Sequence, residues 1–247
     1  MVDDPWFRSF RPAPDRPIRV VCFPHAGGSA SAYLKLAVAV DTLDAQAEMV
    51  IVQYPGRHGR MREPARTDLL VLAEEITEAL AARFTGPVAL FGHSMGAAVA
   101  FEVARGLERL GREPLRLFAS GCRAPSLGRD EDISRLDDAA LIAEMAELGG
   151  TDPRLLAEEE ILRMALPAIR ADYTAIVNYR TAEDARVSCP ITALTGDDDP
   201  RADLASVRAW AKHTSAEFDL RVYPGAHFYL MDQIPQIAEE IGKGLTG

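Results

Sequence analysis

The sequence predicts an α/β fold in which helices flank a mostly parallel sheet. Short apolar segments rich in β-branched residues alternate with amphipathic helical segments through the first half of the chain. Helical connections of this kind return each strand parallel to the previous one, and they cover both faces of the sheet. The alternation breaks between residues 123 and 189, where helical patterns follow one another with no strand between them.

The predicted strands are short apolar segments, and most are bounded by glycine or proline. They are Ile18–Phe23, Met49–Val52, Val88–Phe91, Leu115–Ala119, Ile191–Thr195 and Phe218–Tyr223. Apolar residues at helical spacing predict the helices Leu69–Phe84, Ala97–Leu110, Asp137–Leu148, Ala157–Leu166, Pro167–Tyr179, Asp203–His213 and Pro235–Gly244. Residues up to Pro17 are predicted to form an irregular lead-in, and residues 149–153 a hinge or turn between helices.

Length and composition favour one domain over residues 1–247, with residues 123–189 inserted as a helical lid. A content of 48% hydrophobic and 26% charged residues is typical of a globular enzyme. The net charge of -10 argues against nucleic acid as a partner, because an acidic surface repels phosphate. Three cysteines give no disulfide framework, and no apolar stretch reaches the roughly 18 residues of a membrane span. We therefore expect a cytoplasmic protein that is not bound to a membrane.

The pentapeptide G-H-S-M-G at residues 92–96 lies between a predicted strand and a predicted helix. A serine on so tight a turn is presented for nucleophilic attack, and glycines on both sides let the neighbouring backbone approach. The helix that follows places its N-terminus beside developing negative charge. We therefore predict that Ser94 is the nucleophile of a serine hydrolase of the α/β-hydrolase type.

A nucleophilic serine needs a base and an acid that orients the base. His227 is the predicted base because it follows the last strand, and the chain then has the order Ser, Asp, His. The loop G-D-D-D-P at residues 196–200 supplies the acid. We predict Asp199, since Pro200 restricts its backbone, and keep Asp197 as the second candidate. His213 is predicted to be a charge partner at the end of its helix.

Acyl transfer also needs two backbone N–H groups that stabilise an oxyanion. Met95 follows the nucleophile and supplies one of them, and Ala26 in the loop P-H-A-G-G at residues 24–28 supplies the other. The same loop could be a phosphate-binding loop, but the sequence there has neither a G-x-G-x-x-G pattern nor a P-loop lysine. We expect no cofactor and no metal.

These segments occur together, in order, with Y-P-G-R at residues 54–57 and G-A-H-F at residues 225–228. The set resembles the stand-alone type II thioesterases that accompany polyketide synthases and non-ribosomal peptide synthetases. The resemblance covers roughly the whole chain and implies a helical lid before the strand that carries the acid. It also implies hydrolysis of aberrant acyl groups from the phosphopantetheine arm of carrier domains. The family's catalytic residues fall on Ser94, Asp199 and His227, and its oxyanion amides on Ala26 and Met95.

The resemblance implies acyl or peptidyl carrier domains as partners. Because such domains are usually acidic, docking would need a basic patch on this acidic chain. The candidate clusters are Arg57, Arg60, Arg62 and Arg66, and separately Arg123 and Arg129. Apolar lid residues are expected mainly to pack the lid onto the sheet, with a few facing the substrate: Met145, Leu148, Met164, Leu166, Ile169 and Ile176.

Three other functions fit the same residues. A carboxylesterase or lipase would act on oxygen esters with the same triad. A thioesterase that releases a finished product, in some cases by cyclisation, would share the carrier-bound substrate. A hydrolase-like binding protein with a vestigial site is the non-enzymatic alternative, which the intact serine, acid and histidine disfavour.

Overall fold

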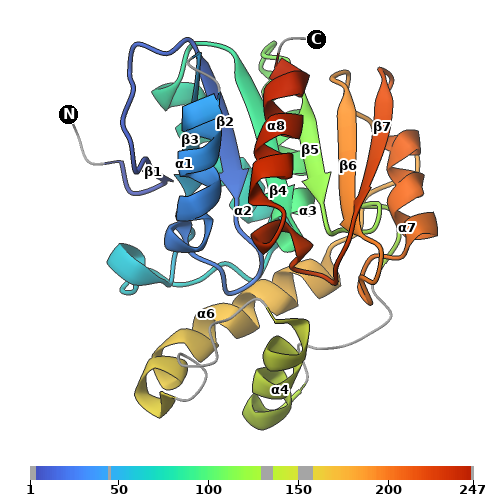
Figure 1. Cartoon of the computed structure of the whole chain (residues 1–247). Helices are drawn as coiled ribbons and strands as arrows, with labels where there is room; N and C mark the ends of the chain where they lie inside the picture. Colours follow the sequence, from blue (N-terminus) through green and yellow to red (C-terminus); the bar gives the residue numbers. More distant parts are fainter. Residues whose placement is uncertain (1–3, 44–45, 129–135, 150–157, 246–247) are drawn as a thin grey trace.

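The computed structural model describes residues 4–43, 46–128, 136–149 and 158–245. Its centre is a seven-stranded sheet in the order β1-β3-β2-β4-β5-β6-β7 (Figure 1). The strands are β1 Phe7–Arg8, β2 Ile18–Phe23, β3 Ala47–Val52, β4 Val88–His93, β5 Leu117–Ser120, β6 Ile191–Gly196 and β7 Phe218–Tyr223. All neighbouring strands are parallel except β1, which pairs antiparallel with β3. The predicted α/β fold class is confirmed.

The predicted strands all form, with ends within two residues of those expected. The prediction of an irregular lead-in was wrong at β1, where Phe7 pairs with Val52 and packs edge-on against the ring of Phe84. Two residues are too few to show an alternating pattern in the sequence. This strand is therefore specified by a tertiary contact that a local pattern cannot reveal.

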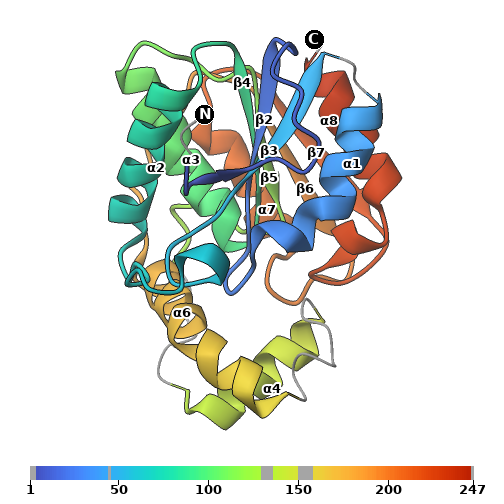
Figure 2. The same cartoon turned by 90° about the vertical axis from the view of Figure 1, so that its left-hand side faces the viewer.

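Helices cover both faces of the sheet, as Figures 1 and 2 show. α1 and α8 lie side by side on one face, and α2 and α3 on the other. The helices are α1 Leu34–Leu43, α2 Leu69–Arg83, α3 Met95–Arg109, α4 Asp138–Leu148, α6 Glu159–Asn178, α7 Leu204–Arg208 and α8 Ile234–Leu245. Each face has its own buried apolar cluster, so the sheet is apolar on both sides as a doubly covered parallel sheet requires. Within the described residues, no helix has the length and apolar composition needed to cross a membrane.

α4 and α6 lie beyond the carboxyl ends of the strands, across the end of the sheet (Figure 1). The sequence predicted α4 and then two further helices, Ala157–Leu166 and Pro167–Tyr179, and the division at Pro167 was wrong. The structure has one helix that continues through Pro167. A proline inside a helix removes one hydrogen bond and costs about 3 kcal/mol. Burial of the following turns, which include Ile169 and Ile176, offsets that cost.

The predicted helix Asp203–His213 is divided into α7 and a 3-10 segment, Ala209–His213. His213 is not the charge partner that the sequence predicted. It is fully buried, with Nδ1 2.7 Å from the carbonyl oxygen of Ala185 and Nε2 2.8 Å from Ser126 Oγ. Burial lowers the pKa of His213, so this histidine is a neutral link between buried loops.

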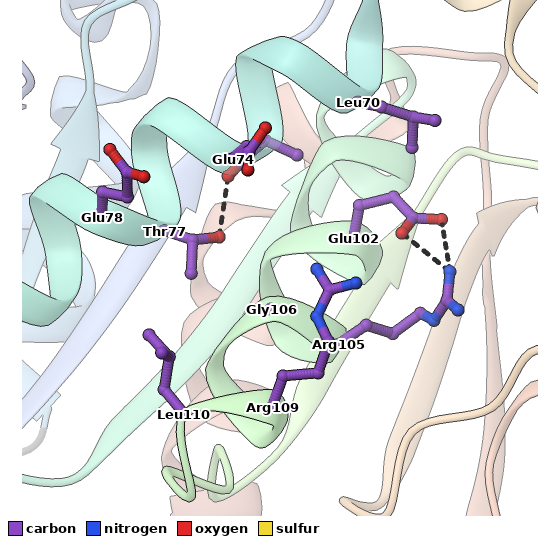
Figure 3. A pocket seen from close by; sticks show the side chains of 10 residues that line it. Leu70, Glu74, Thr77, Glu78, Glu102, Arg105, Gly106, Arg109 and Leu110 are labelled. Carbon is purple, nitrogen blue, oxygen red and sulfur yellow. Dashed lines mark hydrogen bonds and ion pairs between the residues drawn. The ribbon is translucent and has the colours of Figure 1, made fainter.

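α2 and α3 approach each other closely because Gly106 faces Thr77. A groove of about 450 Å³ runs between these two helices, and Figure 3 shows charged side chains of both signs along it. Its lining contains an ion pair between Glu102 and Arg105, 2.9 Å apart, and includes none of Ser94, Asp199 and His227. The groove is therefore a feature of the helical face that is separate from the predicted catalytic residues.

α3 can begin directly at the end of β4 because two glycines bring three backbone segments together. A Cβ on Gly96 would overlap the carbonyl oxygen of Phe23 at the end of β2. A Cβ on Gly92 would overlap the carbonyl oxygen of Gly96 in the first turn of α3. Both neighbours are backbone atoms, which cannot move aside as a flexible side chain would. These two glycines fix the position of Ser94 relative to the sheet.

We predict that Gly96→Ala lowers the free energy of unfolding by about 3 kcal/mol or more, because the added methyl group meets backbone. Urea unfolding followed by circular dichroism measures this change. Gly242→Ala in α8 is the matched control, since a Cβ at that position would meet no atom of the described residues apart from the adjoining backbone of its own helix. That variant should be neutral or up to about 1 kcal/mol more stable. Equal stability of the two variants would contradict the close-approach argument.

Candidate active site

Ser94 lies at the junction of β4 and α3 in a strained backbone conformation. Its φ of 55° and ψ of -120° lie outside the regions that residues with a side chain normally adopt. The amide of Ser94 donates to the carbonyl oxygen of Ser120 at 2.8 Å, which ties the turn to the neighbouring strand β5. The side chain is held at the carboxyl edge of the sheet, in front of the N-terminus of α3.

The structure brings the three predicted catalytic residues together from separate loops. His227 Nε2 lies 3.0 Å from Ser94 Oγ, and His227 Nδ1 lies 3.0 Å from each carboxylate oxygen of Asp199. All three residues are buried, with His227 only 3% exposed. A carboxylate on Nδ1 leaves Nε2 free to accept the hydroxyl proton, which is the arrangement of a general base.

The run of three aspartates in the loop after β6 divides into buried and exposed positions. Asp199 is buried, and its Oδ1 also accepts the amide N–H of Arg201 at 2.8 Å. Asp197 is exposed and accepts the amide N–H of Gly225 at 2.9 Å. The geometry therefore places Asp199, rather than the second candidate Asp197, on the imidazole. Asp197 instead joins the acid loop to the loop that carries His227.

Two other histidines surround His227, and both are held neutral. Burial lowers the pKa of His25 to about 3, with the neighbouring groups His227 and Arg57 adding to the effect. Burial also lowers the pKa of His93 well below its ordinary range, and the His93 ring centre lies 5.2 Å from that of His227. His93 Nδ1 lies 2.9 Å from Ser120 Oγ, so its ring is turned toward β5 and away from the serine. Neutral neighbours leave His227 free to become the positive group in the site.

The loop after β2 passes beside the nucleophile because β2 and β4 are paired strands, with Phe23 opposite Gly92. It makes a turn in which the amide of Gly28 donates to the carbonyl oxygen of His25 at 2.9 Å. Ala26 and Met95 are the predicted oxyanion donors. Among the described residues, neither backbone amide donates a hydrogen bond to a backbone carbonyl in a turn, loop or helix cap. Both lie at the carboxyl edge that carries Ser94.

The predicted basic cluster of arginines does not form an open patch. Arg57 is buried and makes two hydrogen bonds of 2.7 Å to the carboxylate of Asp172 on α6. Arg60 is also buried and pairs with Glu63, and Arg66 pairs with Glu75. In this cluster Arg62 is left exposed. The arginine of the Y-P-G-R segment is thus a structural group beneath α6.

Sequence reasoning did not single out Asp172, which is only 2% exposed. A signal was present, since Asp172 lies three residues after Ile169 and four before Ile176, on the buried face of α6. A charged residue on an apolar helical face requires a partner from elsewhere in the fold. Met145, Ile169 and Ile176 pack into the core cluster as expected for lid residues, whereas Met164 is about half exposed.

The fold and the site geometry together define the class of protein. A serine on a strand-turn-helix junction, with a histidine and a carboxylate beside it on a mostly parallel sheet covered on both faces, is the arrangement of the α/β-hydrolases. Residues 18–245 match the thioesterase domain family. The chain belongs to this family and is a thioester hydrolase.

Known thioesterases are similar over nearly the whole chain. Thioesterase PikA5 of Streptomyces venezuelae is 47% identical over 97% of this chain and 85% of that protein. The solved structure of the type II thioesterase BorB, from the borrelidin biosynthetic cluster, is 43% identical with a TM-score of 0.90, covering 98% of both chains. The structure of YbtT, a type II thioesterase from the yersiniabactin NRPS/PKS biosynthetic pathway, is 31% identical with a TM-score of 0.84, again over 98% of both chains.

The neutral histidines predict that the fold loses stability as the pH falls. The unfolded chain binds a proton at residue 25 below about pH 6.5, whereas folded His25, with a pKa of about 3, does not. His25 alone should therefore remove about 2 kcal/mol of the free energy of unfolding between pH 7.5 and pH 5. Urea unfolding of wild type and His25→Asn at both pH values measures this difference.

The comparison of pH dependence separates this effect from any general destabilisation by the substitution. His25→Asn should lose about 2 kcal/mol less than wild type over the same interval. His58→Asn is the control, because His58 is exposed and asparagine tolerates its positive φ. It should keep the wild-type pH dependence. An unchanged pH dependence in His25→Asn would show that His25 is not buried in the neutral form.

Proposed function

We propose that this chain hydrolyses aberrant or stalled acyl groups from the phosphopantetheine arm of acyl or peptidyl carrier domains, as an editing enzyme of polyketide or non-ribosomal peptide biosynthesis. The observation that carries the chemistry is the line of contacts from Ser94 Oγ through His227 to Asp199, each 3.0 Å long. The similarity to BorB and YbtT, both described as type II thioesterases of biosynthetic systems, supports the substrate class.

In the proposed first half-reaction, His227 Nε2 takes the hydroxyl proton of Ser94 while Oγ attacks the thioester carbonyl carbon. The amides of Ala26 and Met95 stabilise the tetrahedral oxyanion. Asp199 keeps Nδ1 protonated and stabilises the imidazolium. The carbon–sulfur bond breaks, the pantetheine sulfur leaves with the proton from His227, and the acyl group remains as an ester of Ser94.

The second half-reaction replaces the thiol by water. His227, again neutral, removes a proton from water as the water oxygen attacks the acyl-enzyme carbonyl. The same two amides stabilise the second oxyanion, and Ser94 leaves with the proton from His227. The products are a free carboxylic acid and a carrier arm that can be loaded again. In this scheme the chain's own side chains and amides supply every catalytic group.

The position of α4 and α6 across the carboxyl edge supports a substrate that enters as an extended arm (Figure 2). α4 is attached to the acid loop by an ion pair between Glu144 and Arg201, and to α6 by an ion pair between Asp138 and Arg170. A carrier domain outside this lid would deliver its flexible arm to Ser94 beneath it. Cys22, Cys122 and Cys189 are buried thiols, in agreement with the reducing cytoplasm where we place the reaction.

Release of free thiol from an acyl-loaded carrier protein tests the proposal directly. We expect prompt release by the wild type and none above background by Ser94→Ala. An oxygen ester of the same acyl group should be turned over far more slowly. Brisk turnover of the oxygen ester with no thiol release would assign the chain to the esterases. Cyclised or finished product as the main species would instead assign a product-releasing role.

Substitution of the acid tests the proposed triad. Asp199→Asn keeps the shape of the side chain but removes the charge that fixes the histidine tautomer, so kcat should fall by about 10⁴-fold. Steady-state kinetics on one acyl thioester measures the change. Asp198→Asn is the matched control, because Asp198 is the adjacent exposed aspartate and should keep nearly full activity. Equal loss in both variants, or greater loss in Asp197→Asn, would reject Asp199 as the orienting acid.

A further inference from the structure

The loop that carries Ala26 contains a turn whose central peptide has two possible orientations. His25 to Gly28 form the turn, and Gly27 at its third position has a φ of +74°, as a type II turn requires. A turn that ends in the same hydrogen bond but with the peptide between Ala26 and Gly27 rotated by half a turn is of type I. Glycine tolerates both, so the turn sequence alone does not choose between them.

Asp172 supplies the contact that selects one orientation. The amide of Gly27 donates to Asp172 Oδ2 at 2.7 Å, and this amide belongs to the central peptide of the turn. If the peptide rotated, the carbonyl oxygen of Ala26 would point toward the carboxylate instead, and two hydrogen-bond acceptors would face each other in a buried place. The carboxylate therefore makes the rotated form unfavourable as well as stabilising the observed one.

Arg57 holds Asp172 and the end of the same turn. Its Nη1 and Nη2 donate to the two carboxylate oxygens at 2.7 Å each, and Nη1 also donates to the carbonyl oxygen of Gly28 at 3.0 Å. The guanidinium gives a positively charged partner to a carboxylate that is only 2% exposed. The oxyanion loop is thus attached at Gly27 and Gly28 to one buried ion pair.

The backbone of two glycine loops lies directly against α6 at this point. A Cβ on Gly27 would meet Ile169, and a Cβ on Gly56, which precedes Arg57, would meet Ala168 and Ala65. Ala168, Ile169 and Asp172 lie within little more than one turn of α6. This turn of α6 therefore packs directly against the loops that carry Gly27 and Gly56.

We propose that Asp172, held by Arg57, is a positioning residue that sets the oxyanion loop in its catalytic conformation. Catalysis then requires that the turn of α6 around Asp172 stays packed against this loop. The proposal rests on the function proposed above and deepens it. Asp172 touches no reacting atom. It holds the peptide between Ala26 and Gly27, which sets the ψ angle of Ala26 and so the position of the Ala26 amide, which lies in the preceding peptide. Its effect should fall on the transition state, in which the oxyanion forms, and not on substrate binding.

Two double variants separate positioning from stability. Arg57→Met/Asp172→Asn and Arg57→Met/Asp172→Leu both replace the buried ion pair by uncharged side chains of similar size, a change that proteins often accept. Asparagine keeps an oxygen that accepts the amide of Gly27, whereas leucine has none. We expect the asparagine variant to stay within about 10-fold of wild-type kcat and the leucine variant to lose about 10²–10³-fold, with KM changed by less than about 3-fold in both.

A boronic acid that forms a tetrahedral adduct with Ser94 gives an independent readout. Its affinity should fall in the leucine variant by the factor that kcat/KM loses, while the affinity of a non-hydrolysable thioether analogue stays constant. Glu48→Gln is the control, since it neutralises another buried ion pair, with Arg19, at the amino ends of β2 and β3. It should lower the unfolding temperature and leave kcat unchanged.

The outcomes are distinct. Equal kcat in the two double variants, with a wild type that releases thiol through Ser94, would overturn the positioning role and leave the proposed function standing. A wild type without Ser94-dependent thiol release would overturn both. If the leucine variant does not fold, Asp172→Asn alone gives the second test, because asparagine has one acceptor oxygen, for which the Gly27 amide and the Arg57 donors compete. We expect about a 10-fold fall in kcat at constant KM, and unchanged kcat would reject the proposal.

Discussion

The strained turn at Ser94 is the constraint on which the rest of the site depends. With φ at 55°, the serine is held only because the chain around it has no room to relax. Gly92 and Gly96 let β4, α3 and the end of β2 meet backbone to backbone. That contact sets the distance from Ser94 to the loop after β2 and to the loops after β6 and β7. The triad distances of 3.0 Å follow from a rigid frame in which the carboxyl ends of parallel strands converge.

Charge in the site is arranged so that one group can become positive. A second imidazolium at the 5.2 Å ring separation of His93 and His227 would cost about 3 kcal/mol at an effective dielectric constant of about 20. Burial removes this cost by keeping His93 and His25 neutral, and Asp199 supplies the single buried counter-charge on His227. This arrangement lowers the free energy of unfolding at low pH, because both histidines take up a proton in the unfolded chain below pH ~6.5 but stay neutral in the folded one.

The two helices over the site are attached to it by different contacts. The turn of α6 around Asp172 contacts the glycine loops and a buried ion pair, and it packs into the main core cluster. α4 is connected through ion pairs in which Glu144 and Arg201 are partly buried and Asp138 is exposed. The exposed pair of Asp138 contributes at most about 1 kcal/mol. Leu141 and Met145 of α4 are buried in the same core cluster as α6.

The sequence by itself determined the fold class, the strands other than β1, the nucleophile turn and the histidine, because glycine, proline and apolar periodicity act over a few residues. It preferred Asp199 but kept Asp197 as second candidate, divided α6 at Pro167, and named Arg57 in a candidate basic cluster for docking without revealing that this arginine is buried. Each of these depended on which groups the finished fold buries. The pair Arg57–Asp172 joins residues 115 positions apart, and no local pattern carries information over that distance. Tertiary structure alone decided it, because a buried charge is acceptable only where the folded chain delivers its partner.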